Sequence, residues 1–336
     1  MTEAGHLESH IRELCEHRRF TLYVVPQIRH DYKQSDYLYL LYQNLLSSDE
    51  IDVQSLSFWQ HLKFVFAALR NKPVVLHYHW FECVDLKSTG GMLFKLLSIQ
   101  LYTLLGGQLA WTVHNKMPHI RHHTRINRIL RRWLARKADR LFVHCTSVIP
   151  ELAAYFQVPE QKFHHVPHPR YPTKKVDRSA AIQKLNERHH LQLSVEDTLF
   201  LMFGNISSYK QMDRVCELFT SLPTRAKLLI AGPVKKGEMK HYRRVKAYAQ
   251  KSPNICLHPH FIKEQDVCYF FNATDCVLFN YREILTSGGA VLAQSYATPI
   301  IAPAKGCLNE LEGPNVQLFE TEEEFRSLIQ NALNRS

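Results

Sequence analysis

The chain has 336 residues, 45% of them hydrophobic and 22% charged, which are globular values and suit two domains of about 150 residues each. The eight cysteines are scattered without a Cys-x-x-Cys pair, and the first nineteen residues are polar. These features argue against a disulfide framework and a signal peptide, and they indicate reduced thiols in a cytosolic protein. The net charge of +11 indicates an anionic partner: nucleic acid, a membrane surface or a phosphorylated substrate.

In chain order, short apolar segments bounded by polar residues, glycine or proline predict strands, and helical patterns fall between many of them. This alternation predicts two parallel sheets with helices on both faces. The expected strands are 21–25, 74–79, 109–114, 140–144, 199–203, 227–231, 255–257, 276–279 and 299–302.

Two helical segments of the first half bear on the anionic partner. The apolar run 92–105 has about 14 residues, whereas a bilayer span needs roughly 20, so we expect a buried or interfacial helix. The segment 116–140 concentrates positive charge. It is interpreted either as a solvated surface helix or as a basic helix against anionic lipid headgroups or the pyrophosphate of a lipid-linked acceptor. Its expected apolar face is Ile126, Ile129, Leu130, Trp133 and Leu134, and its expected basic face is Arg121, Arg125, Arg128, Arg132 and Arg136.

The most informative stretch is 281–303, where Thr286-Ser287-Gly288-Gly289 leads from a loop into a small, apolar helix. A helix start of small residues exposes backbone N–H groups and the positive end of the dipole, which favours a diphosphate. The alternative is an ordinary serine N-cap followed by a core helix.

Upstream, two apolar strands end in Gly204 and Gly232, and a polar turn carrying Lys210 follows the first. Ligands of parallel sheets bind beyond the carboxyl ends of the strands. Lys210 is therefore either a cation for a leaving diphosphate or a surface lysine at a helix start.

In that order, "FGNISSYK" (203–210), "LLIAGP" (228–233) and "ILTSGGAVLAQSYATPIIAP" (284–303) resemble the donor-binding domain of GT-B glycosyltransferases, the family 4-like group known as glycosyl transferases group 1. The likeness covers roughly 198–312. In the first half, "LHYHW" (76–80), "WTVHN" (111–115), "ADRLFVHC" (138–145) and "VPHP" (166–169) are similar to elements of the same enzymes.

The resemblance implies an α/β fold with two Rossmann-like domains facing a central cleft. The first domain, 1–170, would bind the acceptor, and the second, 171–320, the nucleotide sugar. A proline-rich, basic linker is expected at 167–177. A C-terminal helix at 321–336, with Phe325, Leu328, Ile329 and Ala332 at helical spacing, would pack back on the first domain.

The implied activity is transfer of a sugar from a UDP- or GDP-sugar to a lipid-linked or polysaccharide acceptor in bacterial-type surface glycan synthesis. The protein would be cytoplasmic and peripheral on the inner face of the membrane, without nucleic acid as a partner. The absence of an Asp-x-Asp motif agrees with a metal-independent reaction without a cofactor. His77 and His79 share one strand face, but no carboxylate or cysteine completes a metal site, so structural roles are favoured.

The likeness also implies site residues. Lys210 would hold the pyrophosphate, with Gly204, Asn205, Thr286 and the amides of Ser287, Gly288 and Gly289 around it. Glu310 would bind the ribose and Glu283 the sugar hydroxyls. His114 would hydrogen-bond the sugar or act as a base, and the alternative is a core histidine. Glu283 and Glu310 are otherwise surface carboxylates.

Departures from the family pattern leave the sugar and the stereochemistry open. The two glutamates of the usual E-x7-E motif fall on Ile284 and Leu292, and the arginine expected five residues before Lys210 is Asn205. The glycine-rich first loop is replaced by Val24 to Arg29. The competing interpretation is a non-catalytic α/β protein that binds a nucleotide or nucleic acid, although no nucleic-acid motif is present. A dehydrogenase is disfavoured because no G-x-G-x-x-G follows the first strand.

Overall fold

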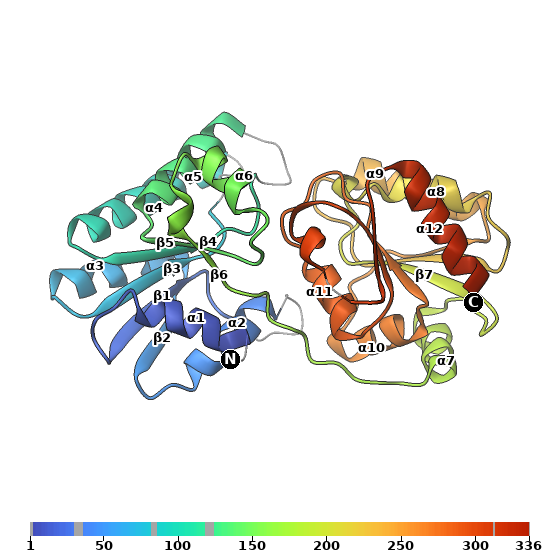
Figure 1. Ribbon diagram of the computed structural model, residues 1–336, viewed down its shortest axis with the longest axis horizontal. Coiled ribbons are helices and arrows are strands. Elements are labelled where there is room, and N and C mark those ends of the chain that lie inside the picture. Colours follow the sequence, from blue (N-terminus) through green and yellow to red (C-terminus); the bar gives the residue numbers. More distant parts are fainter. Residues whose placement is uncertain (1–2, 30–35, 82–85, 118–123, 312, 336) are drawn as a thin grey trace. The chain divides into compact units, whose positions relative to one another are not determined.

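A computed structural model describes residues 3–29, 36–81, 86–117, 124–311 and 313–335. The chain divides into two compact units, Met1–Pro169 and Arg170–Ser336, and the division falls within the proline-rich stretch expected to be a linker. Each unit is a parallel six-stranded sheet with helices on both faces (Figure 1). The α/β fold with two sheets is therefore confirmed.

The first unit has the strand order β2-β1-β3-β4-β5-β6. The crossover from β2 to β3 runs opposite to that from β1 to β2, and right-handed connections place the intervening helices on opposite faces. Accordingly α1 and α2 cover one face and α3 to α6 the other (Figure 1). The strands are β1 (Phe20–Val25), β2 (Ile51–Ser55), β3 (Val74–Tyr78), β4 (Gln108–Thr112), β5 (Arg140–Val143) and β6 (Phe163–His165). The helices are α1 (Glu3–Arg12), α2 (Tyr37–Leu46), α3 (Leu62–Leu69), α4 (Leu86–Leu104), α5 (Thr124–Lys137) and α6 (Ile149–Phe156).

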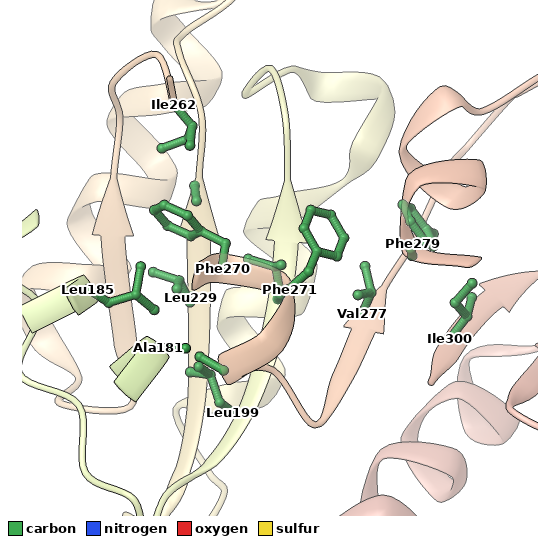
Figure 2. Close-up of a cluster of buried hydrophobic side chains, with 14 of the residues drawn as sticks. Ala181, Leu185, Leu199, Leu229, Ile262, Phe270, Phe271, Val277, Phe279 and Ile300 are labelled. Carbon is green, nitrogen blue, oxygen red and sulfur yellow. The ribbon is translucent and has the colours of Figure 1, made fainter. Parts of the chain in front are cut away.

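The second unit has the strand order β12-β11-β10-β7-β8-β9. One layer of its core lies under α7, α10 and α11, where Phe270 and Phe271 pack with Leu199, Leu229 and Val277 of the sheet (Figure 2). The strands are β7 (Thr198–Phe203), β8 (Ala226–Ala231), β9 (Ile255–His258), β10 (Cys276–Leu278), β11 (Ile300–Pro303) and β12 (Val316–Phe319). The helices are α7 (Arg178–His189), α8 (Met212–Phe219), α9 (Met239–Lys251), α10 (Glu264–Ala273), α11 (Gly288–Ser295) and α12 (Glu322–Arg335).

Three strands were not predicted from the sequence: β2, β6 and β12. Each lies at an edge of its sheet and carries polar or partly exposed residues, as in Ile51-Asp52-Val53-Gln54-Ser55. An edge strand pairs on one side only and does not need a continuous apolar run. The hydrophobic pattern therefore identified the buried strands and missed these three.

The C-terminal helix requires a correction. The apolar side chains Phe325, Ile329 and Leu333 of α12 are buried in the core of the second unit, together with Ile301 and Phe319 of its sheet. The expectation that this face packs back on the first domain is therefore wrong. The helix covers the sheet that immediately precedes it in the chain, and this burial uses its apolar stripe.

The basic helix α5 also differs from its prediction. Its buried face is Asn127, Arg131, Leu134 and Ala135, whereas Ile126 and Ile129 are exposed. The Arg131 guanidinium lies 5.0 Å from the Trp111 ring centre and donates to the carbonyl oxygens of Phe81 and Asn115. The buried face of α5 therefore contains Arg131 in place of part of the apolar face that was predicted. Arg121, which was predicted for the basic face, lies outside the described residues.

Candidate active site

The second unit holds Lys210 in an unusual environment. It ends the short 3-10 helix η3 (Ser208–Lys210) after β7 and is only 6% exposed. Its Nζ donates to the carbonyl oxygen of Phe203 at 2.8 Å. Burial, and to a lesser degree the nearby charge of Lys235, lowers the Lys210 pKa to about 7. The alternative of a surface lysine is therefore wrong, because the side chain is a buried amine.

Gly204 and Gly232 make this arrangement possible. Their φ angles are +86° and +142°, in the region that favours glycine. A Cβ at Gly232 would lie 2.5 Å from the Gly204 carbonyl oxygen, and one at Gly204 would lie 3.2 Å from Lys210 Nζ. The two strand ends therefore approach each other as only glycines allow, and Lys210 folds over the open side of Gly204.

The Lys210 loop contacts the loop that leads into α11. The Arg282 amide donates to the Tyr209 carbonyl oxygen at 2.8 Å, and the Gln211 side chain donates to the Asn280 carbonyl oxygen at 3.2 Å. The Tyr209 and Tyr281 rings stack with centres 5.6 Å apart. The structure thus brings together two segments that are about 70 residues apart in the sequence.

The start of α11 has the serine N-cap that one interpretation of its sequence predicted. Ser287 Oγ accepts from the Ala290 amide at 3.2 Å and lies 2.9 Å from the Tyr281 hydroxyl, so the serine side chain is the N-cap. The amides of Gly288 and Gly289, by contrast, have no acceptor within the described part of the chain. These amides, rather than the serine hydroxyl, are the open donors at the positive end of the helix.

The remaining predicted residues lie around these loops. Asn205 is exposed in the turn after Gly204, and Glu283 is exposed in the loop before α11. Thr286 Oγ1 lies 3.5 Å from Cys307 Sγ, at the start of η4 (Gly306–Glu310), which ends at Glu310. The Cys307 amide donates to the Leu285 carbonyl oxygen at 2.7 Å and holds this turn beside the α11 loop.

Two further cations near the site were missed in the sequence. Lys235 Nζ lies 5.7 Å from the Tyr209 ring centre, and Lys305 Nζ lies 3.4 Å from the Tyr281 carbonyl oxygen. Both follow strand ends, Lys235 after β8 and Lys305 after β11. Their position after predicted strands could have identified both lysines from the sequence, because loops that follow the carboxyl ends of parallel strands lie at one edge of the sheet.

In the first unit, His114 follows β4 and belongs to a cluster of rings at the carboxyl edge of the sheet. Its Nε2 lies 3.0 Å from His79 Nδ1, and the Trp80 indole stacks on it at 4.6 Å. Tyr37 approaches it edge-on at 5.1 Å. Burial holds the pKa values of His79 and His114 well below the usual range, so both imidazoles are neutral at neutral pH.

His77 and His79 are hydrogen-bonded to Tyr42 rather than arranged as metal ligands. Among the described residues, no three His, Cys, Asp or Glu side chains gather in a way that would hold a metal ion. His119, His122 and His123, which also drew attention in the sequence, lie outside the described residues.

The comparisons with known proteins agree with this geometry. Residues 183–335 match the model of the family described as glycosyl transferases group 1. No curated protein sequence matches the chain.

Several solved structures share the fold of the whole chain. HepE of Anabaena in complex with UDP has a TM-score of 0.66 at 12% identity, over 94% of this chain and 90% of that one. Sucrose-phosphate synthase of Thermosynechococcus elongatus has a TM-score of 0.67 at 15% identity, over 94% and 90%. A glycosyltransferase of Rickettsia africae has a TM-score of 0.66 at 13% identity, over 95% and 89%.

Proposed function

We propose that the chain is a GT-B glycosyltransferase of group 1, the family whose model matches residues 183–335, and that it transfers a sugar from a nucleotide diphosphate sugar. The donor is a UDP- or GDP-sugar bound by the second unit. UDP is the first choice, since the similar Anabaena HepE has been solved with UDP and with UDP-glucose. The acceptor is a lipid-linked or polysaccharide glycan, as in the synthesis of bacterial surface glycans.

One observation carries this proposal: a buried amine and two unpaired helix-start amides lie on adjoining loops. Lys210 has no carboxylate partner among the described residues, and Gly288 and Gly289 present free N–H groups. A diphosphate supplies the negative charge that both features favour. When the bond from the sugar to the diphosphate breaks, charge develops on the leaving oxygen, and Lys210 and the amides stabilise it.

A titration with UDP and with uridine tests the phosphate assignment. Lys210→Ala removes a charge-assisted hydrogen bond, so we expect UDP affinity to fall roughly tenfold to hundredfold, with little change for uridine. Lys227→Ala, which removes a lysine bonded to the Pro253 carbonyl at the other end of β8, is the matched control. An equal loss of UDP and uridine affinity in Lys210→Ala would remove the phosphate role.

The proposed reaction is metal-independent, because cationic side chains and amides take the place of a metal at the diphosphate. We expect sugar transfer to persist in EDTA. Activity that disappears in EDTA and returns with Mn²⁺ or Mg²⁺ would contradict this part of the proposal.

The exposed faces of α3 and α4 support the proposal that the acceptor lies at a membrane surface. These two helices pack against each other. On α4, Leu93, Leu97 and Leu104 are 58%, 61% and 71% exposed, and α3 exposes Phe66 and Leu69. Residues 53–138 contain six lysines and seven arginines but only two acids, Glu82 and Asp85. An apolar face with exposed basic residues on neighbouring segments, such as Lys63, Lys72 and Arg125, fits anionic lipid. None of the helices in the described part of the chain is long and apolar enough to cross a bilayer.

Co-sedimentation with phosphatidylglycerol vesicles tests this surface. The triple change Leu93→Gln, Leu97→Gln, Leu104→Gln should release the protein at all salt concentrations. Arg125→Gln with Arg128→Gln should weaken binding mainly at low salt, because salt screens exposed charges. Leu318→Gln, a change at an exposed leucine of the second unit, is the control. If the wild-type protein does not bind these vesicles at low salt, a membrane surface as the place of the acceptor is excluded, and the transferase proposal is unaffected.

A further inference from the structure

A continuous row of hydrogen bonds runs through the first unit and ends at His114. Thr112 Oγ1 lies 2.8 Å from His77 Nε2, and His77 Nδ1 lies 2.5 Å from the Tyr42 hydroxyl. The same hydroxyl lies 2.8 Å from His79 Nε2, and His79 Nδ1 lies 3.0 Å from His114 Nε2. The row therefore connects five side chains of α2, β3 and β4 and the residues that follow these two strands.

The proton count of this row leaves only two arrangements. Thr112 and Tyr42 each carry one hydroxyl hydrogen, and a neutral imidazole carries one N–H and one lone pair. Each of the four bonds needs one hydrogen. Tyr42 is fully buried, and within the described residues its hydroxyl contacts only His77 and His79, so it donates to one of them and accepts from the other. Once the direction of the first bond is chosen, every later bond is then fixed.

In the first arrangement Thr112 donates to His77, His77 to Tyr42, Tyr42 to His79, and His79 to His114. His114 then carries its own hydrogen on Nδ1. In the second arrangement every bond is reversed, and His114 Nδ1 is left with a lone pair. The direction of the row thus decides whether His114 presents a donor or an acceptor at its free nitrogen.

Thr112 decides between the two. It is 1% exposed, and within the described residues its hydroxyl has no acceptor other than His77 Nε2. In the second arrangement its hydrogen would be buried without a partner, which is unfavourable by a factor on the order of ten or more. The first arrangement leaves no hydrogen of the row unpaired before the free end.

We propose that Thr112, His77, Tyr42 and His79 are positioning residues that fix His114 as a neutral Nδ1–H donor. Its free N–H faces an oxygen of the ligand, a sugar hydroxyl or a phosphate oxygen, and His114 does not serve as the base. The identity of that ligand rests on the proposed function, whereas the tautomer does not. His144 illustrates the same control nearby: its Nδ1 donates to the Val166 carbonyl oxygen at 2.8 Å, and its Nε2 accepts from Tyr37 at 2.9 Å.

Imidazole ¹H–¹⁵N correlation spectra of the full ¹⁵N-labelled chain at pH 7.5 test the assignment. His77, His79 and His114 should each carry the proton on Nδ1, with signals assigned by single His→Asn variants. A wild-type His114 protonated on Nε2 would overturn the proposal. This measurement needs no activity and no folded variant of Thr112.

Thr112→Val removes the hydroxyl both as donor and as acceptor, so a reversed row would bury the His77 Nε2–H without an acceptor, and the three protons should stay on Nδ1. The variant should instead shift the ¹⁵N signal of His77 Nε2 downfield, because the lone pair of this nitrogen loses the Thr112 hydrogen. Thr112→Ser should keep the wild-type shift, and UDP affinity should be unchanged in both variants. An unchanged His77 Nε2 signal in a folded Thr112→Val protein would contradict the proposal, because it would mean that Thr112 does not donate to His77. Absence of transfer by the wild type with every nucleotide sugar would instead refute the proposed function alone.

Discussion

Lys210 Nζ donates a hydrogen bond to the carbonyl oxygen of Phe203, the last residue of β7, at 2.8 Å. This bond holds a buried amine against the end of a strand without a counter-charge among the described residues. A neutral acceptor does little to stabilise the ammonium, and this explains why burial dominates the lowered pKa.

The first prediction concerns proton uptake by Lys210 on binding UDP. The Lys210 pKa is about 7 in the free protein, and a bound diphosphate raises it, since opposite charge favours the ammonium. Above pH 7, binding must therefore take up a proton, and UDP affinity should fall up to tenfold per pH unit between pH 7.5 and 9. Calorimetry in buffers of different ionisation enthalpy measures this uptake. Lys210→Met should abolish it, and a pH-independent affinity in the wild type would contradict the assignment.

The second prediction separates steric contact from backbone strain at two glycines of positive φ. Gly232→Ala places a Cβ 2.5 Å from the Gly204 carbonyl oxygen, whereas Gly237→Ala, with φ +87°, meets nothing within 4 Å. We expect about 1 kcal/mol of destabilisation at Gly237 from strain and at least about 2 kcal/mol at Gly232. Thermal unfolding compares the two, and Gly232→Ala should also weaken UDP binding. Equal effects on stability would mean that the close approach of the strand ends is unimportant.

The third prediction tests the buried arginine of α5. Arg131→Met removes the donor to the carbonyl oxygens of Phe81 and Asn115 and should destabilise the first unit by about 2 kcal/mol. Arg128→Met, at an exposed position on the same helix, should change stability by less than about 0.5 kcal/mol. Urea unfolding can be followed by tryptophan fluorescence, because all four tryptophans lie in the first unit. If Arg128→Met proved the more destabilising, the buried face assigned to α5 would be wrong.

The fourth prediction concerns the stability of the first unit at acidic pH. Burial lowers the pKa values of His77 and His144 to about 3 and of His168 to about 4, from 6.5 in the unfolded chain. Below pH 6.5 the unfolded state binds more protons than the folded one. The stabilisation is thus fully present above pH 6.5 and is lost as pH falls toward these folded values.

The free energy of unfolding of the first unit should therefore decrease between pH 6.5 and 5, before most carboxylates titrate. Urea unfolding followed by tryptophan fluorescence at half-unit pH steps measures this slope. A free energy that stays constant from pH 7 to 5 would show that these histidines are accessible and protonated in the folded protein.

The sequence by itself determined most of the fold and the edge of the second sheet at which the candidate site lies. Apolar runs such as 199–203 and 227–231 are short and end in glycine, which is typical of strands buried on both faces, because successive side chains point to opposite faces of a sheet. The glycines that end these strands and the small residues at 286–290 led to the proposed phosphate site, because both features are visible in the local sequence. Edge strands such as 316–319 lack this signal, since half of each is left to solvent.

Only the tertiary structure decided which side chains are buried against which. Arg131 lies over Trp111 and shifts the buried face of α5 from the expected one, and α12 covers its own sheet. Lys210 is a buried amine rather than a surface charge, and Lys235 and Lys305 lie near its loop although they follow other strands. Likewise, the state of His114 depends on Thr112 through three intervening side chains. Such relations depend on distances between segments far apart in the chain, and local pattern does not encode them.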